Sequence, residues 1–267
     1  MPARLFHVSD LHIGRREALA PFTALASLVG ELEPELLLAT GDLAHRGRRT
    51  ELERAAELLD ELHVPVLAVP GNHDMPYTFP ARWTRTFSEW ERAFESTEPS
   101  YRSPSFAVIG LNSARPWRQQ GGSLGSGQLR RIAERFGDGE PTGPIRIAAL
   151  HHHLAAPPWR PGRKKPLVRR NHALQALAAA GVELVAGGHV HQATIVDRRE
   201  FEVIDDPKRR SVVLATAAGF GRPRLHRRGE AQGFNVYEAG DDTLAVTTYA
   251  WDGTTFALVA RRSFRRG

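Results

Sequence analysis

Five apolar stretches of the sequence each end in aspartate, asparagine or histidine side chains. These endings are SDLH (9–12), TGD (40–42), GNHD (71–74), LHHH (150–153) and GGHVH (187–191). Taken singly, each ending is typical of a solvated loop, a turn or a helix N-cap. Their repetition at equivalent positions favours one shared site instead. Because the chain contains no cysteine, a metal ion there must be held by nitrogen and oxygen ligands, which suit manganese, iron and zinc.

The spacing within these endings has a physical reason. Asp10 and His12, like His189 and His191, are separated by one residue. Alternate side chains of an extended strand point the same way, so each pair can present two side chains to one point. Asp42 follows a neighbouring strand, where its carboxylate can bridge two cations. Two cations held roughly 3.5–4 Å apart are the arrangement used in two-metal phosphoester hydrolysis, and the endings predict such a centre.

The apolar stretches themselves predict strands, and predicted helices lie between several of them. The strands cover residues 4–10, 35–42, 64–72, 105–113, 145–153 and 182–191, and the helices cover residues 50–62, 126–136 and 169–181. Thr50 and Glu53 have the spacing of a capping box at the start of the first helix. Alternating strands and helices predict an α/β fold with a largely parallel sheet, whose ligand site lies outside the carboxyl ends of the strands.

The region after residue 191 has a different pattern. Apolar stretches follow one another without intervening helices at residues 193–199, 201–205, 211–218, 234–239, 243–251 and 255–262. They predict a second, mainly antiparallel sheet. No linker rich in serine or proline separates the two regions, so we expect a single domain over residues 1–267. In it, residues 1–191 carry the candidate ligands, and residues 192–267 supply mainly second-sheet strands and a basic tail.

The composition fits one substantial core, because the chain has 267 residues and is 41% hydrophobic. Its net charge of +6 comes almost wholly from arginine. A compositional bias explains this charge better than attraction to nucleic acid, because arginine is spread over the whole chain. The basic loop 160–170, beside Trp159, is nevertheless a candidate surface for a nucleic-acid backbone. No apolar stretch could span a bilayer and the N-terminus lacks a signal pattern, so we expect a cytoplasmic protein without membrane contact.

The five endings, in this order, resemble the signature of the calcineurin-like metallophosphoesterase superfamily, which is DxH, GD, GNHD, a strand ending in histidine, and GHxH. The chain has DLH, GDLAHRG, GNHD, LHHH and GHVH at the matching places of residues 10–191. Within the superfamily, the chain length and the ALHHHL block are most similar to the bacterial class III cyclic-nucleotide phosphodiesterase branch. The resemblance implies a four-layer α/β/β/α sandwich with two mixed sheets, in agreement with the two sheets predicted above.

The resemblance also implies roles for the residues at matching positions. Two metal ions are implied, one held by Asp10, His12 and His191, the other by Asn72, His151 and His189, with Asp42 between them. His73 matches the histidine that assists the leaving group, a proton donor that the chemistry needs. Asp74 can orient that imidazole or simply form a turn. His152 and His153 are candidates to support the ligands, to face the substrate or to be exposed.

Position 45 departs from the superfamily's pattern. Related sequences often carry GDxxD, whereas GDLAHRG has His45 in place of the second aspartate. The exchange leaves the seven implied ligands intact. It changes the hydrogen bonding around them or adds a nitrogen near the second metal ion, and it leaves the metal identity and the substrate open.

We therefore expect a metal-dependent phosphodiesterase, in which metal-bound hydroxide attacks the phosphorus of a small phosphodiester such as a cyclic nucleotide. One alternative is a nuclease or nucleotide pyrophosphatase that uses the same site. Another is a non-catalytic metal-binding scaffold, against which the intact Asp42, Asn72 and His73 argue. The oligomeric state is open, with a homodimer as one arrangement. Segment 219–233, which contains His226 and several arginines, is a candidate loop over the site or dimer contact.

Overall fold

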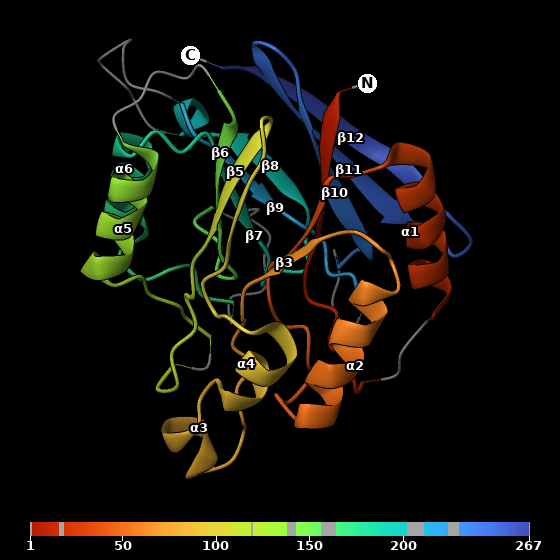
Figure 1. Ribbon diagram of the computed structural model, residues 1–267, viewed down its shortest axis with the longest axis vertical. Helices are drawn as coiled ribbons and strands as arrows, with labels where there is room; N and C mark the ends of the chain where they lie inside the picture. The colour runs from red at the N-terminus through yellow and green to blue at the C-terminus, as the bar shows by residue number, and fades with distance from the viewer. Residues whose placement is uncertain are drawn as a thin grey trace.

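Two six-stranded sheets form the middle of this computed structural model, which describes residues 2–15, 19–118, 120–137, 143–155, 164–201, 211–223 and 230–266 (Figure 1). The first sheet has the order β12-β11-β10-β1-β2-β3 and the second the order β4-β5-β6-β7-β9-β8. The strands of the first sheet are β1 (Ala3–Val8), β2 (Leu36–Ala39), β3 (Val66–Ala68), β10 (Gly233–Ala239), β11 (Thr243–Trp251) and β12 (Phe256–Arg265). Those of the second are β4 (Ser100–Arg102), β5 (Phe106–Gly110), β6 (Ile145–Ala149), β7 (Leu184–Gly187), β8 (Thr194–Asp197) and β9 (Val213–Thr216).

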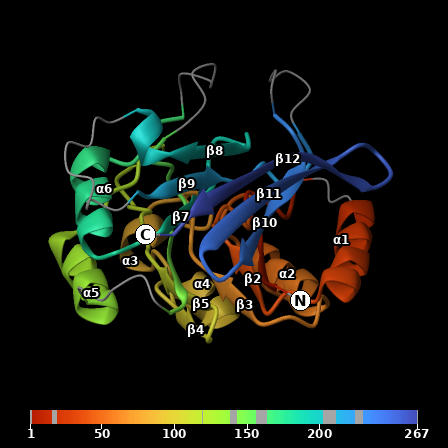
Figure 2. The same ribbon diagram turned by 90° about the horizontal axis from the view of Figure 1, so that it is seen from above.

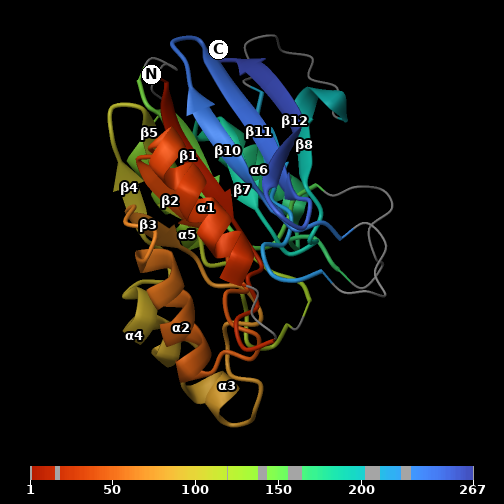
Figure 3. The same ribbon diagram turned by 90° about the vertical axis from the view of Figure 1, so that its right-hand side faces the viewer.

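Helices cover the outer face of each sheet. Helices α1 (Leu19–Leu32), α2 (Arg49–Asp60) and α4 (Ser88–Phe94) pack on the first sheet, and α5 (Ser126–Phe136) and α6 (Arg170–Ala179) pack on the second. Figure 2 shows α5 and α6 on the left of the sheets and α1 on the right. The short helix α3 (Ala81–Thr84) lies with α2 and α4 at the lower end of the molecule (Figure 3). No helix in the described parts of the chain has both the length and the apolar composition needed to cross a membrane.

The pleat of the buried strands explains these layers. In β2, Leu36 and Leu38 point between the two sheets, whereas Leu37 and Ala39 pack against the helices. Strands that are covered on both faces are apolar at every position rather than at alternate ones. Three cores result, one between the sheets and one under each helical layer. The predicted four-layer α/β/β/α sandwich with two mixed sheets is confirmed.

The prediction that the strands after residue 191 form a sheet of their own is wrong. Strand β9 pairs in parallel with β7, and β8 pairs antiparallel with β9, so both belong to the second sheet. Strands β10 to β12 extend the first sheet, where β10 runs antiparallel to β1. The later strands satisfy backbone groups of β1 and β7 that would otherwise be unpaired at the edges of the parallel strands. The predicted strand 201–205 lies outside the described residues from residue 202 onward.

The start of α2 also differs from the prediction. The helix begins at Arg49, and the carboxylate that caps it is that of Glu51. Its Oε2 accepts hydrogen bonds from the backbone N–H groups of Arg46 at 2.7 Å and Arg48 at 3.4 Å. Glu53 instead pairs with Arg49 on the surface. The capping box predicted for Thr50 and Glu53 is therefore wrong, because the buried carboxylate two residues earlier satisfies the free N–H groups.

Candidate metal centre

The carboxyl ends of β1, β2, β6 and β7 bring six of the candidate ligands together. The six follow these strands and are all buried: Asp10 and His12 after β1, Asp42 after β2, His151 after β6, and His189 and His191 after β7. Their side chains form two groups. The first group holds Asp10, His12 and His191, and the second holds Asp42, His151 and His189. Within each group the candidate ligand atoms lie within 4.8 Å of one another.

The first group has the geometry of ligands around one ion. Nε2 of His191 lies 3.0 Å from Oδ1 of Asp10 and 3.3 Å from Nε2 of His12. Two atoms that each bind one metal ion at about 2.1 Å lie about 3.0–3.4 Å apart at octahedral or tetrahedral angles. These two separations match that range, and Nε2 of His12 lies 3.9 Å from Oδ1 of Asp10. The three side chains therefore converge as metal ligands do.

The second group is arranged in the same way and adjoins the first through Asp42. Nε2 of His151 lies 3.1 Å from Nδ1 of His189 and 3.4 Å from Oδ2 of Asp42. The same Oδ2 is 3.9 Å from Nε2 of His12 in the first group. A single carboxylate oxygen thus lies beside both groups, as a bridging ligand must.

Backbone carbonyls fix which nitrogen of each second-group histidine faces inward. Nδ1 of His151 lies 2.7 Å from the carbonyl oxygen of Thr40, and Nε2 of His189 lies 3.0 Å from that of Gln120. A carbonyl oxygen can only accept, so these two nitrogens donate. The opposite nitrogens, Nε2 of His151 and Nδ1 of His189, are therefore the ones that can bind a metal ion. Thr40 and Gln120 contribute only backbone atoms, and no sequence signal could have identified them.

The backbone around the ligands is left-handed. Asp10, His12, Asp42, His189 and His191 have φ between +51° and +73°. The strands end before these residues. The prediction that alternate side chains of an extended strand point toward one ion is therefore wrong. With this backbone, the side chain of His191 lies in the first group and that of His189 in the second. Such conformations cost about 1–3 kcal/mol each and cluster at functional sites, where surrounding contacts hold them.

The loop that carries Asn72 wraps around Asp42. The backbone N–H of His73 donates to Oδ1 of Asp42 at 2.8 Å. A Cβ added at Gly71 would lie 2.3 Å from the same oxygen, so only glycine fits there. Between these two residues, Oδ1 of Asn72 is buried and accepts no hydrogen bond from the described residues. A buried amide oxygen without a donor, beside two converging ligand groups, fits a metal ligand.

His73 is held by two oxygens, and neither belongs to Asp74. Its Nδ1 lies 2.9 Å from the carbonyl oxygen of His45 and 2.7 Å from the hydroxyl of Tyr77. Asp74 instead accepts from the backbone N–H groups of Ala44 at 2.7 Å and Gly71 at 2.8 Å. The suggested contact of Asp74 with His73 is therefore wrong, and its turn role is confirmed. Burial, together with the negative charge of Asp42, raises the pKa of Asp74 to about 7.

Charge and burial act in opposite directions on the ligands. Burial alone would raise the pKa of Asp42, but His151 and His73 hold it well below its usual range. Burial would likewise lower the pKa of His151, but the carboxylate of Asp42 raises it to about 9. Burial keeps the pKa of His189 well below its usual value, so this imidazole is neutral. The negative charge that attracts a proton to His151 attracts a metal cation in the same way.

The neighbouring histidines pack behind the ligands. His152 is fully buried, with Nδ1 2.8 Å from Oγ of Ser113 and its ring 4.7 Å from that of His189. The ring of His153 stacks on that of His189 at 5.8 Å. Neither is exposed, so of their suggested roles the structure favours support of His189. The ring of His45 lies with those of His12 and His73 in a third histidine group.

Two predicted loops lie only partly in the described structure. In the basic loop 160–170, residues 160–163 and the neighbouring Trp159 lie outside it. Lys164 is buried rather than solvated. His226 also lies outside the described residues. The start of segment 219–233 packs on the ligand loop, because Phe220 N–H donates to the carbonyl of Ser9 at 2.7 Å and Gly221 N–H to that of Asp10 at 3.0 Å.

Known proteins resemble this chain in sequence and in fold. A family model described as calcineurin-like phosphoesterase matches residues 3–193. A Synechococcus protein named "Probable cyclic nucleotide phosphodiesterase" is 31% identical over 84% of this chain and 85% of its own length. The 3',5'-cyclic adenosine monophosphate phosphodiesterase of Haemophilus influenzae is 22% identical over 76% of this chain and 75% of its own.

Solved structures share the fold at much lower identity. A dimetal phosphatase from Danio rerio superposes over 100% of both chains with a TM-score of 0.68 at 13% identity. A purple acid phosphatase from yellow lupin superposes over 100% of this chain and 54% of its own, with a TM-score of 0.70 at 14% identity. The family model, by contrast, matches the sequence itself and spans both ligand groups. This chain therefore belongs to the calcineurin-like phosphoesterase family and is a metal-dependent phosphoesterase.

Proposed function

We propose that the protein is a dinuclear metal-dependent phosphodiesterase that acts on small phosphodiesters, with cyclic nucleotides as the substrate class. The position of Asp42 carries this proposal. Its Oδ2 lies 3.4 Å from Nε2 of His151 and 3.9 Å from Nε2 of His12, between two ligand groups. The substrate class is supported by 31% identity to a relative named as a cyclic nucleotide phosphodiesterase.

The ligand groups divide the two ions between them. Asp10, His12 and His191 would hold one ion, and Asn72, His151 and His189 the other, with Asp42 shared. Nitrogen and oxygen donors suit manganese, iron and zinc. Ions of this kind, when bound, supply a nucleophile from water at neutral pH and neutralise charge on the phosphoryl oxygens.

We infer that His73 donates a proton to the leaving oxygen. The centroid of its ring lies 4.9 Å from that of His12, so it borders the first ligand group. Its Nδ1 faces the carbonyl of His45, which leaves Nε2 as the nitrogen available to a substrate. General-acid assistance of this kind contributes about 10²–10⁴-fold to a rate.

A substrate panel tests this function directly. The manganese-loaded protein is assayed on 3',5'-cyclic AMP, 2',3'-cyclic AMP, single-stranded DNA and bis(p-nitrophenyl) phosphate, beside the Asp42→Asn variant. We expect turnover of a cyclic nucleotide by the parent. Asp42→Asn should lose more activity than the roughly 10–100-fold that is typical when a residue that only hydrogen-bonds a metal ligand is replaced. Elemental analysis of this variant should find fewer than two ions per chain.

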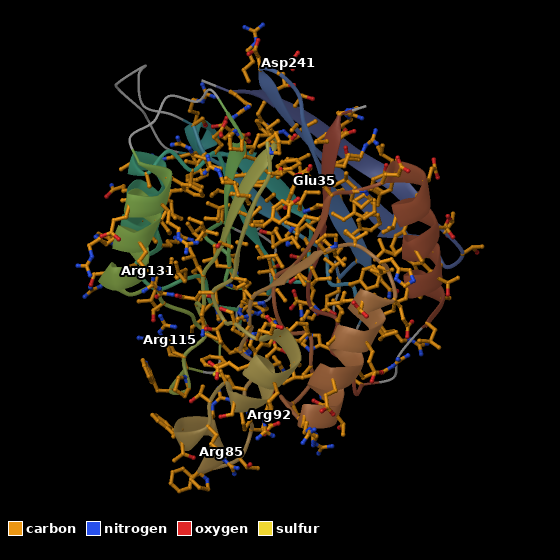
Figure 4. All side chains as sticks on the ribbon, viewed as in Figure 1. Glu35, Arg85, Arg92, Arg115, Arg131 and Asp241 are labelled. Carbon is orange, nitrogen blue, oxygen red and sulfur yellow. The ribbon has the colours of Figure 1, made fainter. Side chains whose placement is uncertain are left out.

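Asp241→Asn is the matched control. Asp241 is exposed in the turn between β10 and β11, next to the amino end of β1, where Ala239 pairs with Ala3 (Figure 4). It lies at the opposite end of β1 from the ligands, so this variant should keep full activity and metal content. Cleavage of DNA with cyclic nucleotides untouched would make the protein a nuclease. Two bound ions without turnover of any substrate would make it a scaffold.

A further inference from the structure

Tyr77 places its hydroxyl on the histidine that borders the site. The hydroxyl lies 2.7 Å from Nδ1 of His73 and 3.5 Å from Nε2, so Nδ1 is its closer partner. Tyr77 is 52% exposed whereas His73 is 9% exposed. The phenol ring therefore lies at the surface beside His73, with the polar end directed inward.

The position of the proton on His73 follows from its second partner. The carbonyl oxygen of His45 lies 2.9 Å from Nδ1 and can only accept. Nδ1 therefore carries a hydrogen that it donates to this carbonyl, and the hydroxyl of Tyr77 lies against the same nitrogen. The carbonyl fixes the protonated position, and the carbonyl and the hydroxyl together restrain the rotation of the ring.

The side chains that could otherwise orient His73 are engaged elsewhere. The ring of His45 stacks on that of His73, with centroids 5.9 Å apart and planes at 20°, and only its backbone carbonyl reaches Nδ1. Both oxygens of Asp74 accept backbone N–H groups. Among the described residues, the hydroxyl of Tyr77 is thus the side-chain group that contacts Nδ1 of His73.

We propose that Tyr77 is a positioning residue for His73, whose hydroxyl and the His45 carbonyl together hold the imidazole with Nε2 directed at the leaving oxygen. This rests on the proposed function. As the P–O bond breaks, the Nε2–H bond breaks too and its proton passes to the leaving oxygen, while Nδ1 keeps its hydrogen. Without the hydroxyl, the ring loses one of its two restraints. Protonation of the leaving group slows, and substrate binding is unaffected.

Leaving-group dependence tests this role. The probes are aryl methyl phosphodiesters whose leaving groups run from p-nitrophenol, which departs without a proton, to phenol, which needs one. Tyr77→Phe should lower kcat roughly 5- to 20-fold on the phenyl ester, the value of one hydrogen bond to a positioned group. It should change the p-nitrophenyl rate less than about twofold and leave KM unchanged. His73→Asn should show the same selectivity with a larger loss, roughly 100-fold or more.

Tyr101→Phe is the control for removal of a hydroxyl. Tyr101 lies in β4 and donates to the carbonyl of Glu35 at 3.5 Å, away from the ligand groups. Tyr101→Phe should change neither the phenyl nor the p-nitrophenyl rate. Elemental analysis of Tyr77→Phe should still find both metal ions. Unchanged rates in Tyr77→Phe, an equal loss on every ester, or a change in KM alone would overturn the inference. If His73→Asn shows selectivity and Tyr77→Phe does not, only the inference fails. If His73→Asn also lacks selectivity, the proton-donor role fails with it.

Discussion

Gly188 lies against the hydrogen bonds that orient Asp10. A Cβ at this position would be 1.8 Å from Oγ of Ser9 and 2.7 Å from Oδ2 of Asp10. Oγ of Ser9 donates to that oxygen at 2.8 Å, as does the backbone N–H of His189. A methyl group at Gly188 would therefore displace the contacts that hold the carboxylate of a candidate ligand.

We expect Gly188→Ala to lower both metal content and stability. Overpacking of this kind costs about 1–3 kcal/mol in the free energy of unfolding. Urea denaturation and elemental analysis measure the two effects. Gly30→Ala is the matched control, because Gly30 is in α1 with nothing within 4 Å of its added Cβ. The free energy of unfolding of that variant should rise by about 0.5–1 kcal/mol, because alanine has a higher helix propensity than glycine. Equal changes in the two variants would contradict the close approach at Gly188.

At the level of residues, side-chain types were predictable and backbone details were not. Asp10, Asp42 and His151 could be identified because polar ligand types follow buried strands in order along the chain. The left-handed backbone at Asp10, Asp42 and His189 could not be predicted, because aspartate and histidine carry no marker for positive φ as glycine does. The carbonyls of Thr40 and Gln120 orient two candidate ligands, yet every residue has a carbonyl. Tyr77 gave no signal either, since its contact depends on the path of the loop.

At the level of elements, the start of α2 depends on a buried carboxylate. Glu51 is 7% exposed, and its Oε2 accepts from the N–H groups of Arg46 and Arg48. Glu53, two residues later, forms only an exposed pair with Arg49. These two glutamates give a matched comparison of a capping role with a surface ion pair.

Glu51→Ala should destabilise the protein more than Glu53→Ala. Loss of the cap costs about 0.5–2 kcal/mol, whereas an exposed ion pair within a helix contributes about 0.3–0.5 kcal/mol. The midpoint of urea denaturation is measured for each variant and for the parent, and the larger drop identifies the more destabilising replacement. A larger loss in Glu53→Ala would mean that the helix begins where the sequence pattern places it, at Thr50.

The strands could be predicted, but their pairing could not. Runs such as Leu36–Ala39 are apolar at every position, which identifies buried strands from local sequence. Strand β10 pairs with β1 across more than two hundred residues of chain. Nothing in either run specifies that partner, because each strand carries apolar residues on both faces and either sheet could accept it. The division of the late strands between two sheets is therefore a property of the assembled fold.

At the level of the whole molecule, a buried polar cluster couples stability to pH. His7 points between the sheets, with Nδ1 2.6 Å from the hydroxyl of Tyr237 and Nε2 2.8 Å from Oγ1 of Thr40. Burial lowers the pKa of His7 to about 3. The unfolded chain therefore takes up this proton at a higher pH than the folded protein does. The stability from His7 is complete above about pH 6.5 and is lost as the pH falls toward 3.

His7→Gln should flatten this part of the pH dependence. A difference of one bound proton between the unfolded and folded states changes the free energy of unfolding by about 1.4 kcal/mol per pH unit. Between pH 7 and 5.5, the variant should therefore lose about 1.2 kcal/mol less of its free energy of unfolding than the parent. Urea denaturation at both pH values measures the difference. His172→Gln, which removes an exposed ring on α6, should behave as the parent does. Parallel pH profiles for His7→Gln and the parent would show that His7 is protonated in the folded state.

Each ligand group draws on both sheets. Asp10, His12 and Asp42 follow strands of the first sheet, whereas His151, His189 and His191 follow strands of the second. Neither sheet alone contains a complete group. A newly made chain whose sheets have formed but not yet docked would thus lack a site for either ion and could not attack phosphodiesters in the cell. Hydrolytic activity therefore depends on the packing of the two sheets against each other, because both candidate metal sites form only there.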